Sequence, residues 1–252
     1  MEIFSIDEGI RQYRFPPHAG RAYGFNILAL LDDETKTAWL VDTAYEAEAS
    51  EARRSLEDEG YRITGVVLSH FHPDHTGGLQ ALPEVDVLGS PHAPETLSMF
   101  GEPAEWESLC PTRTVDASDT VRFGPFVLRF MAAPGHSPCS QYTLIGEKYA
   151  HVADNVMTSN DGQDILPWAE FGRIDDHIRS LELLRTLADR TALLSHGVTI
   201  DDAAILNEAI DNRIAYLQAV LDGGGKIDID QATAKCTCDF LCKQWLIRAD
   251  EE

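Results

Sequence analysis

The chain has 252 residues, of which 44% are hydrophobic and 25% are charged, an ordinary composition for one large globular domain or two small ones. Its formal net charge of -22 disfavours nucleic acids and anionic membranes as partners, because both require a basic surface. No apolar run approaches the roughly 20 residues of a membrane span, and no secretory signal is predicted. Five unevenly spaced cysteines fit a reduced, cytoplasmic protein better than a disulfide framework.

The first third of the chain predicts antiparallel strands, a crossover helix and one more strand. Strands are expected at 2–6, 25–31 and 37–41, and residues 11–21 are expected to form an irregular loop. A helix should follow and end at Gly60, because apolar residues recur at helical spacing at Tyr45, Ala49, Ala52 and Leu56. A short buried strand is then expected at residues 63–68.

The rest of the chain predicts a similar order of elements. The expected strands are 85–88, 120–123, 126–131, 141–145, 148–153 and 192–195. Residues 101–113 are expected to form a surface excursion and 155–174 a long loop. Helices are expected from about Asp175 and over 206–221. These two halves imply two sheets packed face to face with helices outside, in one domain over 1–225 followed by a polar C-terminal tail over 226–252.

The stretch from Ser69 to Gly78 contains four possible metal ligands within six residues: His70, His72, Asp74 and His75. In extended backbone, residues two apart point the same way, so the first two histidines can bind one ion while the other two side chains leave the turn in other directions. Burying this many polar groups without a partner is costly. Imidazole together with carboxylate suits zinc, iron or manganese, and the spacing predicts two neighbouring metal ions.

Three more candidates are expected at strand ends. His136 follows Gly135, which lets the backbone approach closely; Asp154 ends strand 148–153, and His196 ends strand 192–195. Each residue alone is a weak signal. Together with the first cluster they give five histidines and two aspartates, enough for two metals with three protein ligands each and one shared carboxylate.

The motifs His-x-His-x-Asp-His (70–75), Gly-His-Ser (135–137), Ala-Asp-Asn (153–155) and Ser-His-Gly (195–197) resemble those of the metallo-β-lactamase superfamily in order and in spacing. The resemblance covers about residues 1–222, and Val41-Asp42-Thr43 is similar to a strand end whose aspartate supports the family's metal-binding loop. It implies an α/β fold, the αββα sandwich of two mixed β-sheets flanked by helices, which agrees with the predicted elements.

The resemblance also implies roles for the candidate residues. The first metal would be held by His70, His72 and His136, the second by Asp74, His75 and His196, and both by Asp154. The implied cofactors are two divalent metal ions, with zinc expected and iron or manganese as alternatives. A water between the two ions has its pKa lowered towards about 7 and can attack a carbonyl or phosphoryl centre. Asp74 could orient this water as well as bind metal, and Asp42 would hold the ligands in place.

The family performs many reactions, so its fold does not select one. We expect a metal-dependent hydrolase acting on a small thioester, ester or lactone; the alternatives are a phosphodiesterase and a non-hydrolytic iron protein. Hydroxyacylglutathione hydrolases share the seven ligands but carry a basic patch after the shared aspartate, where this chain has no Lys or Arg before Arg173. Lactonases place a tyrosine where this chain has Met157.

Aromatic residues in two loops are candidate walls of the substrate pocket. They are Trp168 and Phe171 in loop 155–174, and Tyr23 and Phe25 in loop 18–25.

The remaining histidines and the C-terminal cysteines are expected to be structural. The histidines are His18, His92, His151 and His177. Cys236, Cys238 and Cys242 are expected to be reduced, partly buried thiols; a metal site and a redox pair are the alternatives.

Overall fold

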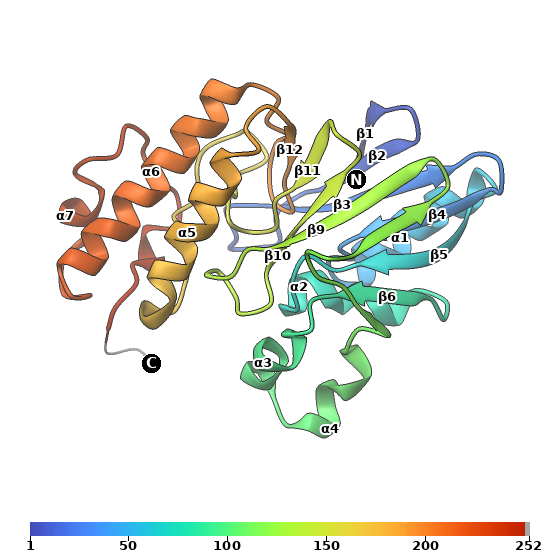
Figure 1. Ribbon diagram of the computed structural model, residues 1–252, viewed down its shortest axis with the longest axis horizontal. Coiled ribbons are helices and arrows are strands. Elements are labelled where there is room, and N and C mark those ends of the chain that lie inside the picture. Colours follow the sequence, from blue (N-terminus) through green and yellow to red (C-terminus); the bar gives the residue numbers. More distant parts are fainter. Residues whose placement is uncertain (250–252) are drawn as a thin grey trace.

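The computed structural model describes residues 1–249, apart from the side chain of Glu105. Two mixed β-sheets lie face to face at the centre, and helices cover their outer faces (Figure 1). This is the αββα sandwich that the sequence predicts. Within the described residues, none of the helices combines the length and apolar character that a bilayer crossing requires.

The larger sheet has seven strands in sequence order, antiparallel from β1 to β4 and parallel from β4 to β7. They are β1 (Glu2–Asp7), β2 (Ile10–Phe15), β3 (Phe25–Asp32), β4 (Thr37–Val41), β5 (Arg62–Val67), β6 (Asp86–Gly89) and β7 (Arg113–Thr114). The second sheet has the order β12-β11-β10-β9-β8, and only its β11–β12 pair is parallel. These strands are β8 (Thr120–Phe123), β9 (Phe126–Ala132), β10 (Gln141–Ile145), β11 (Tyr149–His151) and β12 (Thr191–Leu193).

The α-helices complete the outer layers and the connections. They are α1 (Glu46–Asp58), α2 (Pro73–Thr76), α3 (Ala93–Leu97), α4 (Pro103–Trp106), α5 (Ile174–Arg185), α6 (Ala203–Asp222) and α7 (Ile229–Thr233). Short 3₁₀ helices are η1 (Gly77–Ala81), η2 (Ser98–Phe100), η3 (Glu107–Leu109), η4 (Phe171–Arg173) and η5 (Lys243–Trp245). Helix α1 packs Ala49, Ala52 and Leu56 on the larger sheet, whereas α5 and α6 cover the second sheet.

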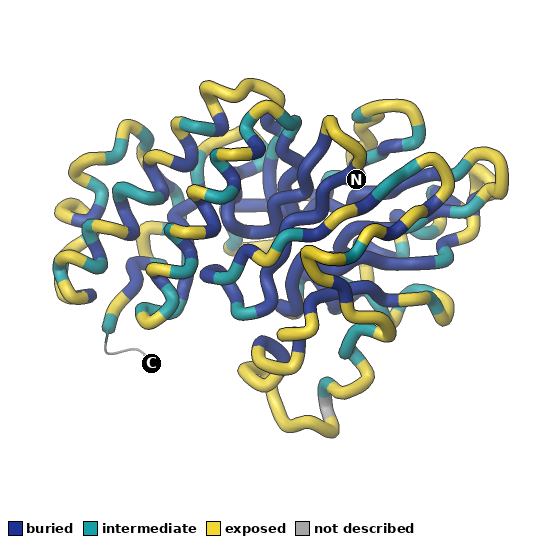
Figure 2. Tube along the Cα trace, viewed as in Figure 1, coloured by how far each residue is buried: buried dark blue, intermediate teal, exposed yellow. Residues whose placement is uncertain are grey.

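Burial follows this layering: the inner strands are largely buried, whereas the edge strands β1 and β7 and the loop tips are exposed (Figure 2). One cluster between the sheets joins Leu30 and Val67 of the larger sheet to Phe130 and Leu193 of the second. Burying large apolar side chains contributes about 1.5–3 kcal/mol each. This inner layer therefore fixes how the carboxyl ends of the strands lie relative to one another, and the candidate residues follow those ends.

Two expectations about local structure need correction. Residues 11–21 are not an irregular loop throughout, because Ile10–Phe15 forms β2 and pairs with both β1 and β3. Its inward side chains include the polar Gln12, which hides the apolar alternation of a strand. The second expectation concerns strand length: the strands expected at 148–153 and 192–195 both end earlier, since β11 ends at His151 and β12 at Leu193.

The segment after residue 225 is polar in composition but partly packed. Helix α7 buries Ala232, and Phe240, Leu246 and Ile247 join the same hydrophobic cluster as α5 and α6. Its backbone also pairs with the long loop, where Leu241 donates to Asp164 O and accepts from Leu166 N. These contacts place the segment against the loop that follows the second sheet.

Arg213 of α6 is fully buried and connects the helix to this long loop. Its guanidinium donates to Asp164 Oδ1 at 2.7 Å, to Met157 O at 2.6 Å and to Ala209 O at 2.9 Å. Removing one partner of a buried ion pair leaves groups without hydrogen bonds. The position of the loop therefore depends on this side chain.

We predict that Arg213→Met lowers the free energy of unfolding by about 2–4 kcal/mol, since the buried oxygens lose their donors. The measurement is denaturant unfolding followed by circular dichroism. Arg54→Met, at an exposed position of α1, is the matched control and should change stability by no more than about 0.5 kcal/mol. Equal stabilities of the two variants would contradict the assignment.

Candidate metal centre

All seven predicted ligands lie at one edge of the sandwich, in segments that follow strands of both sheets. His70, His72, Asp74 and His75 follow β5, and His136 lies between β9 and β10. Asp154 follows β11, and His196 follows β12. Six of the seven are buried, and Asp74 is partly exposed. Residues up to 126 apart in the chain are thus brought to one place.

The seven side chains form three overlapping groups whose ligand atoms lie within 4.8 Å of one another. The groups are His70, His72 and His136; His70, His75 and Asp154; and Asp74, His75 and His196. Among the residues that the structure describes, these are the groups of at least three such side chains close enough to share an ion. The first and third groups correspond to the two sets that the sequence predicts.

Asp154 lies at the centre of the cluster. Its Oδ2 atom is 3.3 Å from His196 Nε2, 3.4 Å from His75 Nε2, 3.5 Å from His136 Nε2 and 3.9 Å from His70 Nε2. One carboxylate oxygen therefore faces imidazoles from both predicted sets.

Several ligand atoms are buried without any hydrogen-bond partner. They are Nε2 of His70, His72, His75 and His196, and Oδ1 of Asp154. Leaving a buried polar atom unpaired costs about 1–3 kcal/mol, and so many at one place are unusual in a native protein. Imidazole nitrogens and carboxylate oxygens are ligands of divalent transition metals, so the residues present fit a metal centre.

Hydrogen bonds on the outer side of the rings fix three of the imidazoles. His75 Nδ1 is 2.8 Å from Asp42 Oδ2, His196 Nδ1 is 2.7 Å from the Gly24 carbonyl, and His136 Nδ1 is 3.2 Å from the Trp168 carbonyl. Because a carbonyl or carboxylate oxygen only accepts, each Nδ1 carries the proton. When such a ring is neutral, its lone pair is on Nε2 and faces the cluster, as in metal-binding histidines.

Asp42 stabilises this arrangement through hydrogen bonds on the side of His75 that faces away from the cluster. It is almost completely buried and accepts hydrogen bonds from Ser69 N, Ser69 Oγ and Ser195 Oγ in addition to His75. Its backbone has a φ of 59°, a conformation that aspartate and asparagine adopt more readily than most residues. Asp42 thus connects the first histidine motif to the segment that carries His196.

The histidines of the cluster differ in the direction of their pKa shifts and therefore in their protonation. Burial lowers the pKa of His72 to about 4 and that of His136 to about 3, so both rings are neutral at pH 7. Burial would also lower the pKa of His75, but Asp154 and Asp42 outweigh it and raise that pKa well above the usual value. The carboxylates therefore favour a positive charge at this place, which a proton or a metal ion can provide.

Two glycines allow the histidine segments to approach neighbouring elements. Gly135 has a φ of 136°, and a Cβ there would lie 2.3 Å from His177 Cα of α5. Gly197 has a φ of 99°, and a Cβ there would lie 2.4 Å from the Thr158 carbonyl. Only glycine fits these positions, which explains why it adjoins His136 and His196.

A cavity of about 370 Å³ opens beside the cluster. Tyr23 and Trp168, two of the four predicted wall residues, line it together with His72, His136 and Asp154. The other two predicted wall residues do not line it. Phe25 is buried behind Tyr45 and His196, and Phe171 lines a neighbouring cavity instead.

Sequence reasoning did not single out Arg21, Tyr45, Phe100 or Trp245, which also line this cavity. Arg21 donates to Asp74 Oδ2 at 3.1 Å, to Tyr23 Oη at 3.1 Å and to Tyr45 Oη at 2.9 Å. Arg21 belongs to loop 18–25, which was expected to form a wall of the substrate pocket. A single arginine in the sequence does not indicate which residue it will contact, and here that residue lies 53 positions away. The positively charged Arg21 side chain therefore contacts Asp74, one of the candidate metal ligands.

The other histidines lie outside the three groups. His18 pairs with Glu48 and His92 with Glu95, whereas His151 and His177 are buried. In the part of the chain that is described, Cys236, Cys238 and Cys242 belong to no group that could share an ion. All five cysteines lie outside disulfide bonds in this structure.

Comparisons with known proteins agree with this geometry. The family model of the metallo-β-lactamase superfamily matches residues 26–196. A hydroxyacylglutathione hydrolase of Photorhabdus laumondii is 32% identical over 199 residues, covering 78% of this chain and 72% of that protein. An atrochrysone carboxyl ACP thioesterase of Pseudocercospora fijiensis is 27% identical over 157 residues, or 61% of this chain. The chain spans less than half the length of this thioesterase and of two further curated relatives.

Solved structures show the same fold. A β-lactamase domain protein of Burkholderia ambifaria superposes with a TM-score of 0.68 at 19% identity, covering 98% of this chain and 86% of that one. The matched family model spans every candidate ligand, from His70 to His196. The chain therefore belongs to the metallo-β-lactamase superfamily, and the predicted fold and the predicted class, a metal-dependent hydrolase, are confirmed.

Proposed function

We propose that this hydrolase binds two divalent metal ions and cleaves small thioesters. One ion would be held by His70, His72 and His136, the other by Asp74, His75 and His196, with Asp154 shared. The observation that supports this assignment is the convergence of three overlapping ligand groups around one carboxylate oxygen, with four Nε2 atoms buried and unpaired. When bound, the two ions would supply a nucleophile from water at neutral pH and polarise the carbonyl that is attacked.

The chain's own residues hold this chemistry in place. Asp42 accepts from His75 Nδ1 and so keeps Nε2 of that ring directed at the site. Asp74 faces the cavity with one oxygen fixed by Arg21, and we assign it the second role of orienting the attacking water. Tyr23, Tyr45 and Trp168 provide cavity walls, which exclude bulk water from the reacting carbonyl.

Thioesters are the preferred substrate class because two curated relatives bear names of thioester hydrolases. The proposed partner is accordingly a small molecule, and a net charge of -22 disfavours nucleic acid. Five free cysteines support a reducing, cytoplasmic location. Zinc is the proposed metal, because imidazole and carboxylate ligands suit it.

We predict that the purified protein contains about two metal equivalents and that His72→Ala lowers both metal content and turnover. The loss of turnover should be roughly 100-fold or more, since nucleophile formation and charge stabilisation both depend on the ion. Elemental analysis and hydrolysis of an activated thioester are the measurements. His92→Ala, which removes an exposed histidine, is the matched control, and an active metal-free protein would contradict the proposal.

We predict that Asp42→Asn weakens metal binding by roughly 10–100-fold, because an amide no longer accepts the His75 proton as a carboxylate does. Asparagine tolerates the same backbone conformation, so the fold should be retained. The measurement is a metal titration against a competing chelator, with circular dichroism as the control for folding. Unchanged affinity would mean that Asp42 has only a structural role.

We predict that thioesters are turned over faster than lactones or bis-nitrophenyl phosphate by the metal-loaded protein. The measurement is kcat/KM for each compound, before and after chelation. A preference for the phosphodiester would favour the alternative of a phosphodiesterase. Visible iron absorption with redox activity and no hydrolysis would favour a non-hydrolytic iron protein.

A further inference from the structure

Arg21 places a positive charge beside the candidate metal centre. It lines the cavity of about 370 Å³ next to the cluster, which we call the catalytic cavity. Its Nη1 atom lies 3.1 Å from Asp74 Oδ2, and its side chain is 34% exposed. A guanidinium is not deprotonated in proteins. A permanent cation therefore lies against one of the seven candidate ligands.

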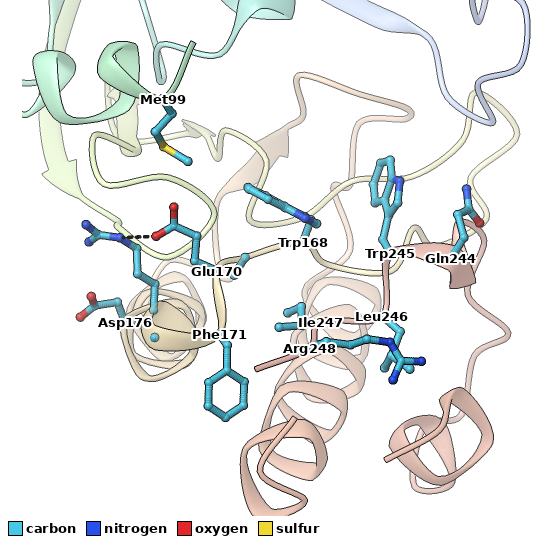
Figure 3. A pocket seen from close by; sticks show the side chains of 13 residues that line it. Met99, Trp168, Glu170, Phe171, Asp176, Gln244, Trp245, Leu246, Ile247 and Arg248 are labelled. Atoms are coloured by element: carbon cyan, nitrogen blue, oxygen red, sulfur yellow. Dashed lines mark hydrogen bonds and ion pairs between the residues drawn. The ribbon is translucent and has the colours of Figure 1, made fainter. Parts of the chain in front are cut away.

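Aromatic side chains hold the Arg21 guanidinium in place. It donates to Tyr23 Oη at 3.1 Å and to Tyr45 Oη at 2.9 Å, and its central carbon lies 5.4 Å from the centroid of the Phe25 ring. Contacts of this kind between a cation and an aromatic ring are stabilising. Trp245 contacts Tyr23 at 5.6 Å between ring centroids and also lines the neighbouring cavity, where Figure 3 shows it among the lining residues. The guanidinium is thus fixed in a packed surrounding.

The loop that carries Arg21 contacts two ligands of the same predicted metal set. Arg21 donates to Asp74, and the carbonyl of Gly24 lies 2.7 Å from His196 Nδ1. The loop is itself anchored, because Gly24 N donates to Asn160 Oδ1 at 3.2 Å. One short segment therefore supports two of the three ligands of this set from outside the cluster.

The other predicted metal set has different supports. His136 Nδ1 lies 3.2 Å from the Trp168 carbonyl, and His70 Nδ1 lies 3.2 Å from Ser69 Oγ. Neither support belongs to the loop that carries Arg21. A change at Arg21 should therefore act on one set of ligands and leave the other unchanged.

Arg21 and a metal ion would share the Asp74 carboxylate. Asp74 Oδ1 lies 3.8 Å from His75 Nε2, and Oδ2, the atom that Arg21 holds, lies 3.9 Å from His196 Nε2. A carboxylate oxygen can accept more than one hydrogen bond, so Oδ2 keeps a free lone pair beside the cavity. A nearby cation, however, repels a second positive charge. The guanidinium must lower the affinity of this carboxylate for an ion.

We propose that Arg21 is a positioning residue of the metal centre with two effects. It fixes Asp74 Oδ2 at the wall of the catalytic cavity, where this oxygen accepts a hydrogen bond from the attacking water. It also weakens metal binding by the set of Asp74, His75 and His196. Removing the guanidinium should therefore tighten metal binding and slow the reaction, whereas loss of a merely structural arginine would weaken both. The inference rests on the proposed two-metal hydrolase.

The test begins with the metal affinities of the zinc-loaded full-length protein. Titration with a chromophoric chelator removes the ions in two steps and gives two dissociation constants. The variant His196→Ala identifies the step that belongs to the set beside Arg21, which we call the His196-dependent step. In Arg21→Met this step should tighten about tenfold, and the other step should change by less than about twofold.

The second readout is the turnover of an activated thioester at saturating zinc. In Arg21→Met we expect kcat to fall at least roughly tenfold, because Asp74 is no longer held in place. KM should change by less than about threefold, since the lost interaction serves the reacting water and not substrate binding.

Two further variants separate charge from position. Arg21→Lys keeps the positive charge but loses the planar fork, so the His196-dependent step should keep its wild-type affinity while kcat recovers only in part. Arg122→Met removes the same charge at an exposed position of β8. It is the matched control and should leave both metal steps and kcat unchanged.

Three results for Arg21→Met would overturn the inference. They are weaker binding in both steps, unchanged metal binding with unchanged turnover, and a higher KM with unchanged kcat, which would mean that Arg21 binds an anionic group of the substrate. If two ions bind but no thioester is hydrolysed, the proposed substrate fails, and a tighter His196-dependent step still supports the electrostatic effect of Arg21. If thioesters are hydrolysed and that step does not tighten, the proposed function stands and the inference fails.

Discussion

The structure depends on one electrostatic constraint: five buried imidazoles and two carboxylates share one small volume. Asp154 Oδ2 lies within 3.9 Å of four of the imidazoles, and several ligand atoms have no hydrogen-bond partner. Such a cluster is unfavourable in the absence of positive charge, because buried polar groups that stay unpaired cost free energy. A bound metal ion would satisfy unpaired atoms, so the groups that cost stability when they stay unpaired are the same groups that fit a metal site.

Cross-sheet hydrogen bonds keep the ligand segments together. Asn26 of β3 donates to the carbonyls of Leu194 and Gly197, on either side of His196. Gln141 of β10 donates to the Leu68 carbonyl, just before His70. Each bond joins one sheet to the strand end of the other. The ligand positions therefore depend on the packing of the two sheets as much as on the motifs.

The segments around the candidate metal centre differ in what they contribute. The candidate ligands follow the strand ends, whereas the long loop and the C-terminal segment line the two neighbouring cavities. Arg213 holds the loop to α6, and backbone pairing holds the C-terminal segment to the loop. Proteins that share a fold are expected to differ in substrate through such surrounding segments. In this chain, those segments include residues outside the range that the family model matches.

The sequence by itself determined the αββα sandwich and the seven candidate ligands. Hairpins, crossover helices and closely spaced histidines are local patterns, and local patterns are visible in a linear chain. Strand β2 was missed because polar Gln12 and its neighbouring arginines obscure the alternation of a strand. Only the tertiary structure decided that Arg21 contacts Asp74, that Trp245 lines both cavities and that Phe25 lies behind the site. Such contacts join residues far apart in the chain, and they form only when both sheets and the C-terminal segment have packed.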